Sequence, residues 1–343
     1  MRIEIVSAVQ PFRIDIHHHL LAPMSLEILK KAGVARDASI GMGPGSQLEL
    51  EQPWDLTRTL AMMDNHSVAS TILSDFAAGY LAKDLQRRLA LVRATNDFLA
   101  QIVTKAPGRF GAFASLPLPS IDAALTELTY ALDTLHLDGV VLAANYSGQY
   151  LGDPAFEPLF AELHRRRSVV FIHPAPPSRS DKTMLKIPAF MLEFAFDTTR
   201  ALTNLIFSGT LRRYPAITII CAHAGGVIPY LESRLIFSRM MTDQMTLAES
   251  AEEIRWALKK IYYDVALSAS PGVFSMLQSL TDPSHLVFGS DCPPGPEQLM
   301  GLTIKGIESY PGFDEQARIM IERDNALALF PRLQALQMDG ATR

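Results

Sequence analysis

Three consecutive histidines stand near the start of the chain, in the segment Asp15-Ile-His17-His-His19. Successive side chains of a β-strand point to opposite faces, so His17 and His19 share one face and His18 points the other way. Two imidazoles on one face at the end of a strand can bind one divalent metal ion. The isoleucines and leucines that flank the triplet favour a buried strand over a chance surface cluster or a purification-tag remnant.

Three further apolar segments end in a residue of the same kind: Val169–His173, Thr218–His223 and Leu286–Asp291. A single His or Asp after a strand is more often a hydrogen-bonded structural group or a helix cap. Four such ends on one face of a barrel converge on one point, and catalytic residues of β/α barrels come from these ends. Three histidines and one carboxylate suit zinc, manganese or iron better than calcium or magnesium.

Residue types that would indicate other chemistry are missing from the sequence. A binuclear site of this kind often adds a bridging carboxylated lysine on the fourth strand, but no lysine lies between Lys105 and Lys182, which predicts a mononuclear site. No serine nucleophile elbow, Cys–His signature or phosphate-binding loop competes with the histidine cluster.

The elements that must position these residues follow from the hydrophobic pattern. Eight short apolar, β-branched segments alternate with stretches of helical periodicity such as Leu85–Val103, Ile121–Leu135 and Thr57–Asn65. The predicted strands are Phe12–His17, Ala69–Ser74, Phe110–Leu116, Gly139–Ala143, Val169–His173, Ile217–Ala222, Ile261–Leu267 and Leu286–Ser290.

Eight β-α alternations predict an α/β fold, a (β/α)8 TIM barrel that forms a single domain over residues 1–343. An open doubly wound sheet is the alternative, but it needs a glycine-rich phosphate turn after the first strand, where this chain has His-His-Leu-Leu. Long inserted loops are expected after strands 1 and 5, at residues 20–57, which include Gly41–Gly45, and at residues 174–196. Such connections tend to line or cover the pocket.

Composition restricts the class of protein. The chain has 343 residues, 48% of them hydrophobic and 20% charged, which is typical of a globular enzyme with a large core. The net charge of −5 argues against nucleic-acid binding. Cys221 and Cys292 suggest no disulfide framework, and no signal peptide or membrane-spanning segment is evident, so we expect a cytoplasmic location.

Together the motifs resemble those of the amidohydrolase superfamily, in the branch typified by aminocarboxymuconate semialdehyde decarboxylase. The shared pattern spans nearly the whole chain. It comprises Asp15-x-His17-x-His19, Phe171-Ile-His173-Pro174, His223-Ala-Gly-Gly226-x-x-Pro229-Tyr-Leu-x-x-Arg234 and Phe288-Gly-Ser-Asp291-x-Pro293, with smaller agreements at Met63-Asp64, Asn96-Asp97 and Pro107–Phe110.

The resemblance implies a role for each matching residue. His17, His19, His173 and Asp291 would hold one divalent metal, with zinc expected first and manganese as the alternative. His223 would be a catalytic acid/base group beside the metal, and Asp291 would be both ligand and possible proton donor.

Arg234 matches a family arginine that binds a substrate carboxylate, sometimes across a dimer interface, and the resemblance therefore implies a homodimer. A planar guanidinium binds a carboxylate through two parallel hydrogen bonds. The competing interpretation of Arg234 is a surface ion pair with Glu232 or Asp243.

The segment Met191–Gly209 resembles the corresponding stretch of 6-methylsalicylate decarboxylases and related aromatic-acid decarboxylases. Phe190, Phe194 and Phe196 are candidates for an aromatic wall over a ring-shaped substrate, although anchoring the loop in the core is an equal alternative. Asn145 and Tyr146, just after the fourth strand, are further candidates for the pocket.

These features lead to three hypotheses about function. The first is metal-dependent, non-oxidative decarboxylation of a small aromatic or unsaturated carboxylic acid. The second is hydrolysis of an amide, lactone or ester by a metal-activated water, with His223 as the general base. The third, a non-catalytic barrel, predicts that at least one strand-end residue is lost, and none is.

Overall fold

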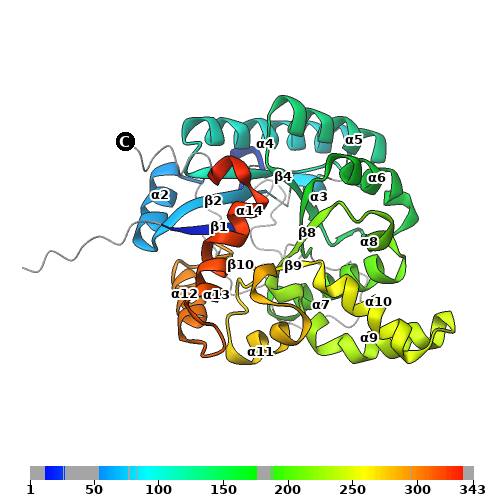
Figure 1. Cartoon of the computed structure of the whole chain (residues 1–343). Helices are drawn as coiled ribbons and strands as arrows, with labels where there is room; N and C mark the ends of the chain where they lie inside the picture. Colours follow the sequence, from blue (N-terminus) through cyan, green and yellow to red (C-terminus); the bar gives the residue numbers. More distant parts are fainter. Residues whose placement is uncertain are drawn as a thin grey trace, which may run out of the picture.

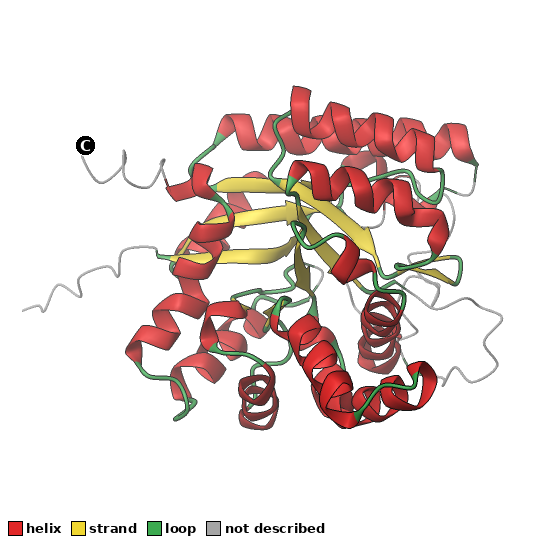
Figure 2. Ribbon diagram, turned by 45° about the vertical axis from the view of Figure 1, so that its right-hand side comes forward, coloured by secondary structure: helices red, strands yellow, loops and turns green. Residues whose placement is uncertain are grey.

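The structure is a computed structural model that describes residues 12–25, 27, 54–75, 78–82, 84–175, 187, 189–293 and 295–334. Eight parallel strands lie at the centre and helices surround them, as Figures 1 and 2 show. The strands are adjacent in the order β1-β2-β3-β4-β7-β8-β9-β10. The predicted (β/α)8 barrel is therefore confirmed, and the open doubly wound sheet is excluded because strand order follows chain order throughout.

The strands of the barrel are β1 (Arg13–His19), β2 (Val68–Ser74), β3 (Phe110–Ala114), β4 (Gly139–Ala143), β7 (Val169–His173), β8 (Thr218–Cys221), β9 (Tyr262–Asp264) and β10 (Leu286–Val287). A separate antiparallel hairpin is formed by β5 (Asn145–Tyr146) and β6 (Gln149–Tyr150).

The helices are α2 (Leu56–Asn65), α3 (Ala78–Leu81), α4 (Leu85–Lys105), α5 (Ile121–Thr129), α6 (Glu157–Arg166), α7 (Ala189–Phe207), α8 (Thr210–Arg213), α9 (Ile228–Asp243), α10 (Leu247–Lys259), α11 (Pro271–Leu280), α12 (Gln298–Ser309), α13 (Glu315–Ile319) and α14 (Asn325–Leu329). Short 3₁₀ and π segments are η3 (Tyr130–Thr134), η4 (Pro154–Phe156), η5 (His223–Gly225), η6 (Pro283–His285) and η7 (Met320–Asp324).

Side chains of the strands fill the interior of the barrel. Ile14 and Ile16 of β1 and Phe171 of β7 belong to one buried cluster, in which the rings of Phe113 and Phe171 stack with their centroids 5.5 Å apart. Phe330, just after α14, packs against Phe113 and belongs to the same cluster. In Figure 1 α14 lies across the near end of the barrel. The interior of the barrel is thus a packed core. The candidate active site lies at the opposite end from α14, where the strands have their carboxyl ends.

The first strand closes the barrel against the segment that follows β10. The peptide N–H of Ile16 donates to the carbonyl of Phe288 at 3.1 Å, and that of His19 donates to Cys292 at 2.7 Å. Asp291 donates its N–H back to the carbonyl of His17 at 2.9 Å. We call this contact between β1 and residues 288–292 the closing seam.

Asp15 ties the closing seam together with a buried carboxylate. Its Oδ1 accepts the peptide N–H of Ser290 at 2.9 Å, and its Oδ2 accepts the hydroxyl of Ser290 at 2.6 Å. Oδ1 also accepts the N–H of His17, and Oδ2 lies 3.1 Å from Nδ1 of His18. One side chain therefore satisfies four donors from both sides of the seam.

The long connections are only partly described. Residues 28–53, which include Gly41–Gly45, and residues 176–186 lie outside the described residues, so their role around the pocket stays a prediction. The second connection was expected to run to residue 196, which is wrong at its end because α7 begins at Ala189. The apolar periodicity of residues 189–196 belongs to that helix.

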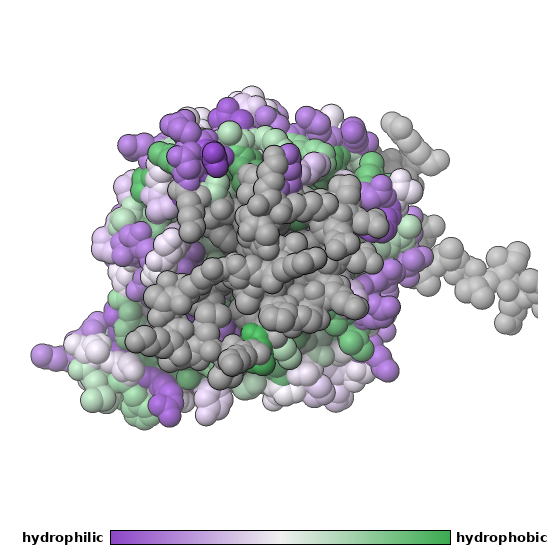
Figure 3. Space-filling model, turned by 180° about the vertical axis from the view of Figure 1, so that it is seen from behind, coloured by the Kyte–Doolittle hydropathy of each residue, from purple (hydrophilic) through white to green (hydrophobic). Residues whose placement is uncertain are grey.

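The outer surface mixes hydrophilic and hydrophobic residues. Figure 3 views the molecule from behind, and the projecting corner of α9 and α10 at its lower left carries both kinds. Within the described residues, no helix is long and apolar enough to cross a membrane. That the whole chain forms a single domain stays a prediction.

Loss of the Asp15 carboxylate should destabilise the barrel. Asp15→Ala leaves buried donors without an acceptor, each costing about 1–3 kcal/mol, so the free energy of unfolding should fall by roughly 3 kcal/mol or more. Urea denaturation measures it. Asp55→Ala, which removes the exposed cap of α2, is the control and should cost about 1 kcal/mol. Equal losses for both variants would contradict this role.

Candidate active site

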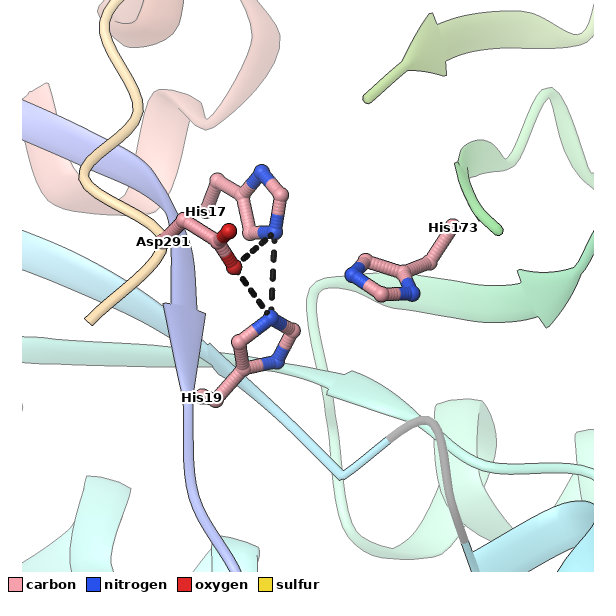
Figure 4. A group of neighbouring side chains, drawn as sticks. All are labelled: His17, His19, His173 and Asp291. Atoms are coloured by element: carbon pink, nitrogen blue, oxygen red, sulfur yellow. Dashed lines mark hydrogen bonds and ion pairs between the residues drawn. The ribbon is translucent and has the colours of Figure 1, made fainter. Parts of the chain in front are cut away.

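Four potential metal ligands meet at the carboxyl ends of the strands. His17 and His19 come from β1, His173 ends β7, and Asp291 follows β10. One nitrogen or oxygen atom from each lies within 4.8 Å of the others. Figure 4 shows the side chains pointing toward one shared point, although they come from elements far apart in the sequence. The structure thus brings together all four residues that the sequence singled out as ligands.

Asp291 joins this cluster to His223. Its Oδ1 lies 2.8 Å from Nε2 of His19 and 3.1 Å from Nε2 of His17, while its Oδ2 lies 3.3 Å from Nε2 of His223. Asp291 has a left-handed backbone with φ of 58°, a conformation that costs a non-glycine residue about 1–3 kcal/mol and is found mainly at functional sites. The closing seam holds it there through its N–H bond to His17.

Two of the histidines have their second ring nitrogen occupied by a hydrogen-bond acceptor. Nδ1 of His17 donates to Oδ2 of Asp264 at 2.9 Å, and Nδ1 of His173 donates to the carbonyl of Pro174 at 2.7 Å. A metal-binding histidine usually uses its other N–H in this way, because the bond fixes the tautomer and the orientation of the ring. In both residues Nε2 is therefore the atom available to a metal, and the residues fit a mononuclear site.

Each side chain of the cluster changes the pKa of its neighbours. Burial lowers the pKa of His17, but the carboxylates of Asp264 and Asp291 outweigh it and raise that pKa to about 10. Burial raises the pKa of Asp291, yet His17 and the other two contacting imidazoles hold it well below its usual range. Burial lowers the pKa of His19, and burial together with the neighbouring imidazoles lowers the pKa of His173. The cluster thus supplies an anionic carboxylate and two neutral imidazoles, the forms in which these groups bind metals, whereas His17 would release a proton when a metal binds.

His223 stands beside the ligand cluster on a constrained turn. His223 and Ala224 both have positive φ, at 55° and 57°, and Gly226 follows at 69°. A Cβ on Gly226 would lie 2.1 Å from the carbonyl oxygen of Ala195 in α7, so only glycine permits this approach. The turn therefore fixes where His223 points, against Asp291 and next to the four potential ligands.

His18 lies on the opposite face of β1, as the alternation of the strand predicts. It is fully buried, and its Nδ1 contacts Asp15 and none of the cluster residues. His18, the middle histidine of the triplet, therefore belongs to the closing seam and not to the cluster.

One residue of the candidate aromatic wall lies at the cluster, and contact of Phe190 with a substrate stays a prediction. Phe194 is buried, and its ring centroid lies 6.1 Å from that of His173 in an edge-to-face arrangement. Phe190 and Phe196 are 43% and 38% exposed, so neither is a packed core anchor. Phe194 is the aromatic side chain of α7 that the structure places beside the cluster.

Asn145 and Tyr146 are buried with their polar groups engaged. Asn145 donates from Nδ2 to Oδ1 of Asp197 at 2.9 Å and accepts the N–H of Gly148. The hydroxyl of Tyr146 accepts the N–H of Ala143. Asp197 also accepts from the Tyr150 hydroxyl and the Ala175 N–H, so it links the β5–β6 hairpin to the segment after His173. Contact of Asn145 with a substrate stays a prediction.

Arg234 is exposed on α9, and within the described residues no ion pair engages it. The two acidic residues considered as its partners bind other arginines. Glu232 pairs with Arg255 at 2.7 Å, and Asp243 pairs with Arg239 at 2.9 Å. The interpretation of Arg234 as a surface ion pair with either residue is therefore not what the structure has.

Asp264 is a site residue that the sequence analysis missed. It ends β9, is fully buried, and contacts both His17 and the backbone of His223. The sequence did contain a signal, because a carboxylate within the apolar predicted strand Ile261–Leu267 needs a buried partner. β9 is shorter than predicted because Asp264 accepts the N–H of Ala266 and turns the chain out of the sheet.

Comparison with known proteins relates the chain to amidohydrolases and decarboxylases. A family model described as amidohydrolase matches residues 14–332. The chain is 37% identical over 328 residues to 6-methylsalicylic acid decarboxylase of Penicillium expansum, with 94% of this chain and 98% of that protein covered. It is 35% identical to a decarboxylase of Aspergillus niger, covering 94% and 88%.

A solved structure with the same fold is 5-carboxyvanillate decarboxylase of Novosphingobium aromaticivorans, complexed with manganese and a nitrobenzoic acid. The TM-score is 0.80 at 20% identity, with 93% of this chain and 96% of that chain covered.

Metal analysis tests the ligand cluster directly. The purified protein should hold about one tightly bound divalent ion per chain, and His173→Ala should lower its affinity for zinc at least tenfold because a ligand is lost. His18→Asn is the matched control, since the amide can still donate to Asp15 and the metal content should not change. Chelator competition measures the zinc affinity of both variants. If only His18→Asn lost metal, the placement of His18 on the face of β1 away from the cluster would be contradicted.

Proposed function

Because the chain belongs to the amidohydrolase family, we propose that it is a metal-dependent, non-oxidative decarboxylase of a small aromatic carboxylic acid of the salicylate type. The observation that carries this proposal is that the two oxygens of Asp291 face different partners. One of its oxygens faces the potential ligands and the other faces His223. A metal ion held by these residues would supply positive charge beside His223, a group able to transfer a proton.

We propose that one divalent ion binds to Nε2 of the three histidines and to Asp291, with zinc expected first and manganese as the alternative. Nitrogen-rich ligand sets of this kind suit both ions, and the reaction needs no redox change. The related decarboxylase fold with bound manganese supports the second choice. When bound, the ion would supply the charge that holds the substrate's carboxylate and the adjacent hydroxyl.

The protein's own residues then handle the proton. The His223–Asp291 pair, joined at 3.3 Å, delivers a proton to the ring carbon that bears the carboxylate. The bond from that carbon to the carboxylate breaks, its electrons return to the ring, and CO₂ leaves. His223 and Asp291 then regain their proton from water. Phe194 is the aromatic surface against which the ring packs.

Hydrolysis by a metal-activated water uses the same residues and is the competing function. The similarity to relatives named as decarboxylases over most of their length favours decarboxylation. The two reactions differ in product, because only decarboxylation releases CO₂ from an intact aromatic acid. An assay on metal-loaded enzyme with salicylate-type acids, amides and lactones separates them.

We expect CO₂ release from at least one salicylate-type acid, and His223→Ala should lower kcat by about 10²–10⁴-fold while zinc affinity stays within twofold of the parent. The reason is that His223 contacts the oxygen of Asp291 that faces away from the other histidines. Carbon dioxide capture measures turnover, and chelator competition measures the metal. Turnover of amides or lactones with no CO₂ from any acid would overturn the proposed reaction.

We propose further that the chain forms a homodimer through α9, with Arg234 binding the substrate carboxylate in the partner's site. Tyr230, Arg234, Phe237 and Met241 recur at the spacing of one helix face. The three hydrophobic members are 73%, 53% and 77% exposed, which is unusual for large apolar side chains on one face. The guanidinium of Arg234, which has no ion pair among the described residues, lies within this stripe. A cytoplasmic location stays a prediction of the sequence.

Mixed dimers test the shared site. Arg234→Ala and His17→Ala chains should each be inactive alone, and mixing them should restore part of the activity because one intact site forms in each mixed dimer. Met241→Glu should shift the protein toward monomer in sedimentation experiments. Failure of mixing to restore activity, although subunits are shown to exchange, would contradict a site shared between subunits.

A further inference from the structure

We propose that Asp264 is a positioning residue that sets the metal site and the proton-transferring histidine at the same time. The inference rests on the proposed metal-dependent function and adds to it a residue outside the set of ligands. Asp264 lies at the end of β9, is fully buried, and uses its two oxygens for different partners.

Oδ2 of Asp264 fixes the tautomer of His17. A carboxylate oxygen only accepts hydrogen bonds, so at 2.9 Å Nδ1 of His17 must carry the hydrogen. Nε2 is then the nitrogen that faces His19, His173 and Asp291, and it becomes free to bind a metal when it gives up the proton that it shares with Asp291. Both side chains are fully buried, so water does not compete for this bond.

Oδ1 of Asp264 holds the turn that carries His223. It accepts the peptide N–H of His223 at 3.1 Å and that of Ala266 at 2.9 Å. His223 and Ala224 have strained, left-handed backbones, which persist only where surrounding contacts over-determine them. The N–H bond to Asp264 is such a contact, and it helps to aim the imidazole at Asp291.

The segment after β10 packs closely against Asp264. A Cβ added to Gly289 would lie 2.8 Å from Cβ of His17 and 3.4 Å from Cβ of Asp264. The chain after β10 therefore packs directly on these two residues. Asp264→Ala removes the acceptor that the chain itself holds in place, and it removes it from both partners at once.

Asparagine separates the two roles. Its single acceptor oxygen will face the two peptide N–H groups, because the opposite orientation would place its NH₂ against two donors. Its NH₂ then faces Nδ1 of His17, which must become the acceptor, so the hydrogen moves to Nε2 and blocks metal binding. Asp264→Asn thus keeps the His223 turn and damages only the metal site.

The test compares Asp264→Asn and Asp264→Ala with the parent enzyme. Zinc affinity is measured by chelator competition, Co²⁺ coordination by visible absorption, and kcat and KM at saturating metal. Both variants should bind zinc about 10–100-fold more weakly, with an altered Co²⁺ spectrum. At saturating metal, Asp264→Ala should lose about 10²-fold more in kcat than Asp264→Asn, because only the alanine variant also releases His223.

Asp138→Asn is the matched control, since it also neutralises a carboxylate that accepts a peptide N–H and an arginine, away from the cluster. It should leave metal affinity and kcat unchanged.

A parent enzyme that binds no metal would overturn the proposed function itself. A parent that binds metal, together with Asp264→Asn of unchanged affinity and Co²⁺ spectrum, would overturn the role of Asp264 alone. Equal kcat for the two Asp264 variants would remove its role toward His223.

Discussion

The active-site end of this barrel depends on the compensation of buried carboxylates. Asp15 and Asp264 are fully buried, and Asp291 is partly buried, with 17% of its side chain exposed. A buried ionised carboxylate is costly unless its oxygens accept hydrogen bonds or meet positive charge. Here the donors are peptide N–H groups, a serine hydroxyl and imidazoles from β1, the turn after β8 and the segment after β10. Satisfying three carboxylates therefore forces these segments together, and the position of the histidines follows.

Much of this arrangement was predictable because it follows from the periodicity of strands. Alternation separated His17 and His19 from His18, and the parallel β-α order placed His173 and Asp291 at the same end of the barrel. β4 and β7 have the predicted bounds to the residue, since each is a short segment of mainly apolar residues.

The remainder was not predictable because it depends on contacts between distant residues. Asp264 stands in the chain as one polar residue in an apolar segment, and only the fold shows that it contacts His17 of β1. The partner of Glu232 was equally hidden, because Arg255 lies on the neighbouring helix α10. The partner of Asp243 is Arg239, four residues earlier in α9, which competes with Arg234 for the same carboxylate. Helical spacing alone gives possible ion pairs, whereas three-dimensional packing decides among them.

The site and the stability of the fold are physically coupled. His17, His19 and Asp291 lie on the two sides of the closing seam, so an ion bound by all three would cross-link β1 to the end of the last strand. Binding that occurs only in the folded state adds to the free energy of unfolding. The left-handed backbone of Asp291, unfavourable by itself, is then offset from two directions, by the N–H bond to His17 and by the charge that its carboxylate meets. The contacts that close the barrel are therefore the contacts that bring the candidate ligands together.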